Sequence, residues 1–294
     1  MLMHAVPAPE DAHALRAAIA TALDGGPPVA TDLPLPGPVG AAVVPEGTAL
    51  LVTTSGSTGT PRTVALRADA LVASATATHA RLGGPGQWLL ALPTTHVAGL
   101  QVIVRSHVAG VDPVVPTPDG PRGTGLLVDL VRRAGPGRRY ASLVPTQLHR
   151  VLTGATAGHV DGLEALDALR TLDAILVGGA ATPPATLAQA RDHGLRVVTT
   201  YGMSETCGGC VYDGVPLPGV DVRQVGGVLE IAGPVLAAGY VGPPGTPQGG
   251  FTTDPATGRR WFRTNDLGTV TRTRATPSDP SGSTPSRSWA APTT

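Results

Sequence analysis

The stretch TALLVTTSGSTGTP, residues 48–61, shows the alternation that decides the fold. Residues 48–53 form a short apolar run typical of a buried strand, and residues 54–61 form a loop of hydroxyl side chains and glycines. Apolar runs recur at 88–92, 140–144, 174–177 and 195–200, with helical patterns at 9–24, 68–82, after 98, after 145 and at 184–193. Buried strands that alternate with helices predict an α/β fold with mostly parallel sheets flanked by helices.

The sequence pattern divides the chain into three parts. Residues 1–210 carry the alternating strands and helices and should form an α/β core. Residues 211–270 contain short strands and turns, which predict a small β-rich subdomain. Residues 271–294 have almost no apolar residue and no period, so we expect a disordered tail there.

Composition excludes several classes of partner. The 294 residues hold 21 Lys or Arg, all of them Arg, against 21 Asp or Glu, so the formal net charge is zero. A neutral chain without a basic run lacks the electrostatic footprint for nucleic acid or an anionic membrane surface. No apolar segment approaches the roughly 20 residues of a membrane helix, and the first residues do not resemble a secretory signal. We therefore expect a cytoplasmic protein whose two cysteines, in Cys-Gly-Gly-Cys at 207–210, are reduced.

The small-residue loop is the strongest local signal of a binding site. Its hydroxyl and backbone N–H donors can converge on one anion, as in phosphate-binding nests. No Gly-Lys-Ser/Thr follows, so the loop is not a Walker loop; the alternative is a flexible linker. The candidate phosphate ligands are Thr54, Ser55, Gly56, Ser57, Thr58, Gly59 and Thr60.

Further candidates follow later strands. Gly-Met-Ser-Glu-Thr at 202–206 approaches the nucleophile elbow of serine hydrolases, but Thr206 replaces the required small last residue, so Ser204 is a poor nucleophile candidate. Glu205 can instead bind Mg²⁺ and the Thr206 hydroxyl can contact a phosphate. Asp266 can accept hydrogen bonds from two ribose hydroxyls, although an Asp in a turn is most often a cap. His96 at a strand end also has a purely structural alternative.

Taken in order, these segments resemble a known family. TTSGSTGTP (53–61), LPTTHVAGL (92–100), GGAATP (178–183), YGMSET (201–206) and WFRTNDLG (261–268) are similar to the motifs of the adenylate-forming acyl- and aryl-CoA ligases. SETCGGCVYDG, from residue 204, resembles the o-succinylbenzoate-CoA ligases of menaquinone biosynthesis. The resemblance implies the large N-terminal domain of adenylate-forming enzymes, with ATP, Mg²⁺ and coenzyme A as cofactors and a small carboxylic acid as substrate.

The resemblance also implies roles for individual residues. A carboxylate would attack the α-phosphate of ATP, and the thiol of coenzyme A would then displace AMP. The loop at 54–60 would hold the β- and γ-phosphates. Thr206 would contact the α-phosphate, Glu205 would bind Mg²⁺, Asp266 would bind the ribose, and His96 would stand between the acyl pocket and the thiol channel. The adenine site would be formed by Gly178, Gly179, Ala180 and Tyr201.

Two departures from the family pattern affect these expectations. The phosphate loop usually ends Thr-Pro-Lys, whereas Arg62 follows Pro61 here and keeps the charge in a planar group. Family members also carry a C-terminal domain with a catalytic lysine, and this chain contains no Lys. We therefore expect a truncated chain with impaired turnover. Its tail at 271–294 would be the family's hinge segment translated in a shifted reading frame. The alternatives are a non-catalytic nucleotide- or acyl-binding remnant and a ligase for another acid, and a homo-oligomer is possible.

Overall fold

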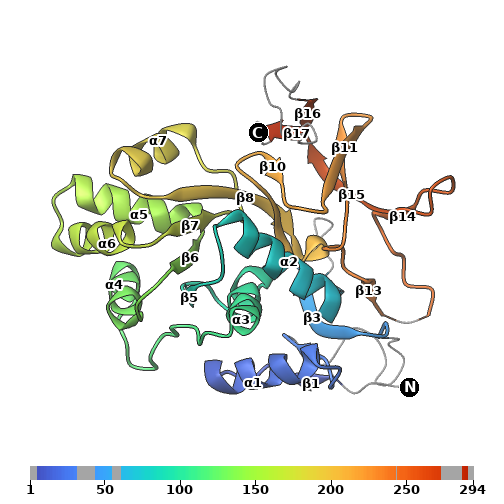
Figure 1. Cartoon of the computed structure of the whole chain (residues 1–294), viewed down its shortest axis with the longest axis horizontal. Helices are drawn as coiled ribbons and strands as arrows, with labels where there is room; N and C mark the ends of the chain where they lie inside the picture. Colours follow the sequence, from blue (N-terminus) through green and yellow to red (C-terminus); the bar gives the residue numbers. More distant parts are fainter. Residues whose placement is uncertain (1–4, 32–43, 55–60, 243, 273–286, 291–294) are drawn as a thin grey trace.

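A six-stranded sheet forms the centre of the molecule. The computed structural model describes residues 5–31, 44–54, 61–242, 244–272 and 287–290 (Figure 1). Strands β5 (Gln87–Leu89), β6 (Arg139–Leu143), β7 (Ala174–Val177) and β8 (Val197–Met203) run parallel. Strands β9 (Gly208–Tyr212) and β10 (Val215–Pro216) extend the sheet antiparallel. The predicted strands and their parallel order are thus confirmed, and the sheet continues past residue 210.

Helices cover both faces of this sheet. Alternate residues of β7 point to opposite faces: Ala174 and Leu176 join one apolar cluster, whereas Ile175 and Val177 join the other. Helices α2 (Ala68–Arg81) and α3 (Val97–Ala109) bury their apolar sides in the first cluster. The second cluster lies under α4 (Thr124–Arg133), α5 (Pro145–Thr156), α6 (Val160–Arg170) and α7 (Pro184–Asp192). Sequence analysis did not predict α4 and α6.

A second, mixed sheet has five strands, of which four precede the central sheet in the chain and one follows it. It contains β1 (Val6–Pro7), β2 (Val29–Ala30), β3 (Thr48–Thr54), β4 (Arg62–Arg67) and β13 (Gly239–Val241), and α1 (Ala12–Leu23) packs beside it. Strand β4 pairs antiparallel with β3, so the small-residue loop connects two strands of a hairpin. The helical pattern at 68–82 was the next element expected after the loop, so β4, whose sequence RTVALR is short and has Arg at both ends, was not predicted.

The β-rich region forms a third sheet. Its strand order is β11 (Asp221–Val225), β12 (Val228–Ala232), β15 (Arg260–Leu267) and β14 (Phe251–Thr253), all antiparallel. Strand β13, which lies between β12 and β14 in the chain, leaves this region and pairs with β4. The β-rich region is therefore tied into the second sheet, and one apolar cluster runs through both.

Two short strands lie at the end of the described chain, partly within the segment that was expected to be a disordered tail. Strands β16 (Thr269–Arg272) and β17 (Arg287–Ala290) pair antiparallel in register, with Val270 opposite Trp289. Backbone pairing does not require the apolar periodicity on which the expectation rested. The rest of the predicted tail lies outside the described residues.

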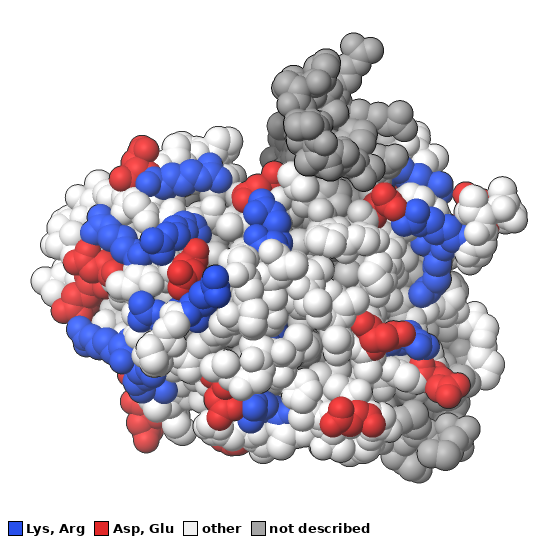
Figure 2. All heavy atoms as spheres, viewed as in Figure 1, with Lys and Arg blue, Asp and Glu red and all other residues white. Residues whose placement is uncertain are grey.

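The surface carries interspersed charges. On the face shown in Figure 2, Arg side chains lie among acidic ones and the middle of the face is mostly uncharged. No helix within the described residues is long and apolar enough to cross a membrane.

Candidate active site

A tight turn between β8 and β9 carries two of the predicted site residues. The one-turn 3-10 helix η1 (Ser204–Thr206) links the strands. The Thr206 hydroxyl accepts from Met203 N at 3.0 Å and donates to Gly208 O at 2.8 Å, so it closes the turn. A Cβ on Gly202 would lie 2.1 Å from Gly208 O, so only glycine fits there. The turn thus buries Thr206 completely and leaves Glu205 half-buried at its apex.

Helix α3 supports this turn from below. The Gln101 side chain is fully buried, and its Nε2 donates to Cys207 O at 2.6 Å. Cys207 has a left-handed backbone conformation, with φ 52°, and its carbonyl oxygen also accepts from Ser74 Oγ on α2 at 3.4 Å. Gln101 and Ser74 together satisfy this buried carbonyl and tie the turn to the two helices.

Glu205 and Arg62 meet at one tyrosine. The Tyr240 hydroxyl donates to Glu205 Oε1 at 2.8 Å, and the Arg62 guanidinium carbon lies 5.1 Å from the centre of the Tyr240 ring. Burial raises the pKa of Tyr240 to about 12, with the Glu205 carboxylate adding to the rise and Arg62 opposing it. The phenol is therefore a proton donor throughout the neutral range.

A second tyrosine–carboxylate pair lies across the same junction. The Tyr201 hydroxyl on β8 donates to Asp266 Oδ2 on β15 at 2.7 Å. Burial, reinforced by this hydrogen bond, raises the pKa of Tyr201 well above its usual value. Asp266 N donates to Thr264 Oγ1 at 3.1 Å, which holds the backbone of Asp266 in place. Oδ1 of Asp266 makes no hydrogen bond to a described residue and can accept from a ligand.

The phosphate-loop candidates Ser55, Gly56, Ser57, Thr58, Gly59 and Thr60 lie outside the described residues. The ends of the loop are described: Thr54 pairs with Arg62 in the β3–β4 hairpin, and Thr54 Oγ1 donates to Arg62 O at 3.3 Å. The hairpin therefore delivers both ends of the loop beside Tyr240 and Glu205.

The Gly178–Ala180 loop follows β7 at the carboxyl edge of the central sheet. A Cβ on Gly178 would lie 2.2 Å from Thr200 Oγ1, so the loop packs directly against the residue before Tyr201. Gly179 and Ala180 also line an open pocket of about 1340 Å³, whose other lining residues lie mostly on α5, at the start of α6 and before or in α7. The loop thus lies next to the residue that precedes Tyr201.

His96 is the N-terminal cap residue of α3, and its side chain is exposed. The next residue, Val97, lies close to Gly208, since a Cβ on Gly208 would be 4.0 Å from Val97 Cγ2. The structure therefore places the His96 segment beside the Glu205 turn but shows no direct contact between these two side chains.

Sequence analysis missed Tyr240 and Arg105. Arg105 on α3 is 3% exposed; its guanidinium donates to Tyr212 OH at 3.3 Å and Ser142 Oγ at 3.5 Å and lies 4.8 Å from the Trp88 ring centre. Its Nε has no hydrogen-bond partner, and no described carboxylate pairs with it. A lone Arg within the apolar run VAGLQVIVRSHVA was the available signal. The local sequence around Tyr240 contains no pattern that predicts its contact with Glu205.

The two cysteines are poorly suited to redox chemistry. Both are fully buried, and burial raises the pKa of Cys210 to about 12 and that of Cys207 further still. The thiolate is the reactive form, so both side chains are inert in the folded state. Within the described residues no cluster of three or more His, Cys, Asp or Glu side chains forms a metal site.

Comparison with known proteins decides the family. The model of the AMP-binding enzymes matches residues 6–241. The chain belongs to this family. Among AMP-binding enzymes, the probable 2-succinylbenzoate–CoA ligase of Mycobacterium tuberculosis (strain ATCC 25618 / H37Rv) is 47% identical over 228 residues, covering 77% of this chain and 56% of that protein. The 2-succinylbenzoate–CoA ligase of Escherichia coli K12 is 31% identical, covering 73% and 44%. The chain thus spans about half the length of these relatives.

Solved structures of AMP-binding enzymes share the fold. The o-succinylbenzoate CoA synthetase of Bacillus subtilis bound to ATP and magnesium superposes with a TM-score of 0.60 at 25% identity, covering 75% of this chain and 47% of that one. Its complex with the acyl-adenylate intermediate OSB-AMP gives a TM-score of 0.61 at 25% identity, covering 75% and 46%. The expected α/β fold of the adenylate-forming enzymes is confirmed.

Proposed function

We propose that this chain is the nucleotide- and acid-binding part of an o-succinylbenzoate-CoA ligase. In the proposed reaction the acid's carboxylate attacks the α-phosphate of ATP, which gives an acyl-adenylate and releases pyrophosphate. The thiol of coenzyme A then attacks the acyl carbon, and AMP leaves. The observation that carries the proposal is the Tyr201–Asp266 bridge of 2.7 Å beside the turn that presents Glu205.

Different residues of the chain would bind the different parts of the nucleotide. Asp266 Oδ1 is available to accept from the ribose, and Tyr201 with the Gly178–Ala180 loop offers a flat surface to the adenine. Residues 54–60 and Arg62 would hold the β- and γ-phosphates. The buried Thr206 hydroxyl keeps the turn closed, and it would reach the α-phosphate only by exchanging one of its present hydrogen bonds. Positioned donors of this kind are the main means by which proteins accelerate phosphoryl and adenylyl transfer.

The residues present fit a magnesium ion that is held mostly by the substrate. Mg²⁺ in nucleotide sites prefers oxygen ligands and takes one or two carboxylates together with phosphates and water. Glu205 supplies one half-buried carboxylate whose Oε1 is oriented by Tyr240, and its Oε2 makes no hydrogen bond to a described residue. The ion, when bound, would neutralise charge that develops on the phosphate oxygens.

Arg105 is the residue from which we infer a dicarboxylate substrate. A buried cation without a carboxylate partner costs free energy unless an anion joins it. Arg105 lies on α3, the helix that His96 caps and that Gln101 fixes to the site turn. We propose that the second carboxylate of the acid pairs with Arg105, directly or through water. His96 would then face the end of the acid where coenzyme A arrives.

Calorimetry with ATP and Mg²⁺ tests the nucleotide half. Asp266→Ala should weaken binding by about one to two decades, since a hydrogen bond to a charged group contributes roughly 1.5–3 kcal/mol. Asp254→Ala is the control in the same region, because Asp254 contacts its own turn and, at 3.8 Å, Arg223, but neither Tyr201 nor Asp266. Equal ATP affinity for wild type and Asp266→Ala would remove Asp266 from the site.

The acid half is tested by binding in the presence of ATP. We expect o-succinylbenzoate to stabilise the chain against heat more than benzoate or a medium-chain fatty acid does. Arg105→Gln should lower the preference for the dicarboxylate over benzoate, whereas Arg105→Lys should retain part of it. Stronger stabilisation by the fatty acid would favour a ligase for another acid, and ATP binding without pyrophosphate release for any acid would favour a non-catalytic remnant. The proposed function also predicts a cytoplasmic location, and it is compatible with a homo-oligomer.

A further inference from the structure

Tyr240 stands between a cation and a carboxylate that belong to the same site. Its hydroxyl donates to Glu205 Oε1 at 2.8 Å, and its ring lies under Arg62, with 5.1 Å between the guanidinium carbon and the ring centre. Arg62 forms no ion pair with any carboxylate in the described parts of the chain. One side chain thus contacts both groups while they stay unpaired.

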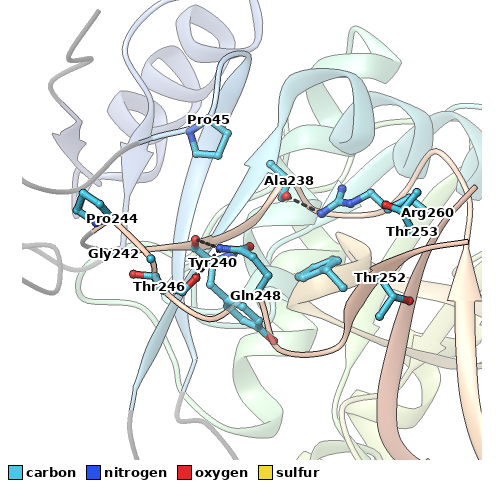
Figure 3. A pocket seen from close by; sticks show the side chains of 12 residues that line it. Pro45, Ala238, Tyr240, Gly242, Pro244, Thr246, Gln248, Thr252, Thr253 and Arg260 are labelled. Atoms are coloured by element: carbon cyan, nitrogen blue, oxygen red, sulfur yellow. Dashed lines mark hydrogen bonds between the residues drawn. The ribbon is translucent and has the colours of Figure 1, made fainter. Parts of the chain in front are cut away.

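The fold itself fixes the position of Tyr240. In β13 it pairs with Val64 of β4, two residues after Arg62. Gln248 accepts from Tyr240 N at 3.0 Å and donates to Tyr240 O at 3.2 Å; Figure 3 shows this side chain beside the tyrosine. The ring also packs edge-on against Phe251, with centres 5.6 Å apart. The backbone of Tyr240 is therefore held on both sides, and its hydroxyl has a defined direction.

The chain at Gly249 packs closely against one edge of the Tyr240 ring. A Cβ on Gly249 would lie 2.9 Å from Tyr240 Cε2 and 3.2 Å from Arg62 Nη1. Gly249 therefore lies close to both the ring and the guanidinium, and it leaves no room for a side chain between them.

A neutral spacer has a clear electrostatic advantage at this place. If Arg62 paired directly with Glu205, each would offset the charge that the other needs for its ligand, the phosphates for Arg62 and the metal for Glu205. A phenol donates one hydrogen bond without removing the negative charge of the carboxylate, and its ring face attracts the guanidinium. Tyr240 therefore orients both groups and leaves both charges available.

We propose that Tyr240 is a positioning residue that aims the Glu205 carboxylate at the metal of Mg·ATP and prevents its ion pairing with Arg62. The proposal rests on the proposed function, since it takes Glu205 as the metal-binding carboxylate. It predicts an effect on the magnesium-dependent part of nucleotide binding and none on the adenine and ribose contacts, which Tyr201 and Asp266 supply.

The test is isothermal calorimetry of the full chain with Mg·ATP, with ATP in EDTA, and with AMP. Tyr240→Phe keeps the ring under Arg62 and removes only the hydroxyl; we expect Mg·ATP affinity to fall about tenfold and AMP affinity to stay within about twofold. Tyr240→Leu also removes the ring, so Arg62 and Glu205 can pair, and the Mg·ATP affinity should fall further. In the double variant Tyr240→Phe/Glu205→Gln the losses should not add, because both substitutions remove the same interaction.

Tyr140→Phe is the matched control for a lost tyrosine hydroxyl. Tyr140 OH donates to Leu82 O at 3.2 Å and Gly84 O at 2.9 Å, on the far side of α2, so this variant should lower the unfolding temperature without changing the magnesium dependence. Unchanged Mg·ATP binding by Tyr240→Phe, or equal weakening of Mg·ATP and AMP, would overturn the Tyr240 proposal alone. A wild-type chain that binds neither nucleotide would overturn the proposed function and this inference together.

Discussion

The α/β region and the β-rich region are held together by different forces. In the α/β region, residues 44–216, strands such as β7 are fully buried between two apolar clusters. In the β-rich region, residues 217–272, the buried Glu230 lies between Arg223 at 2.7 Å and Arg263 at 3.0 Å. Its Trp261 is covered by Arg223, whose guanidinium carbon lies 3.8 Å from the ring centre. Apolar packing dominates the first region, and arginine-centred pairing is prominent in the second.

The contrast matters because the candidate site lies where the two regions meet. Each region contributes one tyrosine and one carboxylate: Tyr201 reaches across to Asp266, and Tyr240 reaches back to Glu205. Each of these hydrogen-bonded pairs therefore joins the two regions. The site is therefore sensitive to any change in how the regions are joined, and substitutions at the junction should cost more than similar substitutions at the periphery.

The largest expected effect is that of Gly202→Ala at the junction. Its Cβ would lie 2.1 Å from Gly208 O, a backbone atom that cannot move without opening the turn that carries Glu205. We expect a loss of roughly 4 kcal/mol or more in the free energy of unfolding, which overpacking of rigid backbone can cause. Urea denaturation measures it, or the soluble yield if the variant does not fold.

Gly226→Ala is the matched control at the tip of the β11–β12 hairpin. Gly226 has a φ of 59° and a Cβ there would meet nothing within 4 Å, so only the left-handed backbone strain of roughly 1–2 kcal/mol applies. Equal losses for the two variants would show that the junction is no more sensitive than the periphery.

A second prediction concerns acid and whether the two regions unfold as one. His79 is buried on α2 and accepts from Trp88 Nε1 at 3.1 Å; burial, with Arg105 adding to it, lowers the pKa of His79 to about 4. Between the unfolded value of 6.5 and the folded value, the unfolded chain binds more protons, so stability falls as pH falls through this window. The full loss is roughly 3 kcal/mol. His79→Gln should flatten this slope, and the exposed His149→Gln should not.

The same titration tests the coupling between regions. The β-rich region contains no histidine, so its own packing has no reason to weaken in this window. One apolar cluster nevertheless runs through both regions, so Trp88 and Trp261 should report a single transition with the same pH dependence. A Trp261 signal that does not follow the pH dependence would show that the β-rich region unfolds on its own.

Sequence was a good guide wherever burial is continuous along the chain. The strand at Ala174–Val177 and the helix at Pro184–Asp192 follow from local apolar runs and proline or glycine boundaries. The motif residues Glu205, Tyr201 and Asp266 lie at one junction, where Tyr201 donates to Asp266 and Tyr240 donates to Glu205. Strand β4 was not predicted because it is short and has Arg at both ends, although its four central residues are buried.

Sequence was a poor guide where a residue's role depends on distant pairing. Tyr240 contacts Glu205 because β13 crosses from the β-rich region to pair with β4, and no local periodicity encodes that crossing. Gln101 is similar, since its partner is a carbonyl 106 positions away. Such contacts follow from topology and are seen only once the sheets are assembled.

The smallest expected effects compare ion pairs in the two regions directly. Glu230→Gln leaves two arginines beside a neutral amide in a site where the Glu230 side chain is 8% exposed, so we expect a loss of about 2 kcal/mol in unfolding free energy. Glu164→Gln on α6 removes the ion-pair partner of Arg132 on α4. The Glu164 side chain is 49% exposed and the Arg132 side chain 70%, so solvent and salt screen the pair. The loss in unfolding free energy should therefore stay below about 0.5 kcal/mol. Urea denaturation at low and high salt measures both. If Glu230→Gln proves as mild as Glu164→Gln, charge pairing does not hold the β-rich region together, and its stability must come from the apolar cluster that it shares with the α/β region.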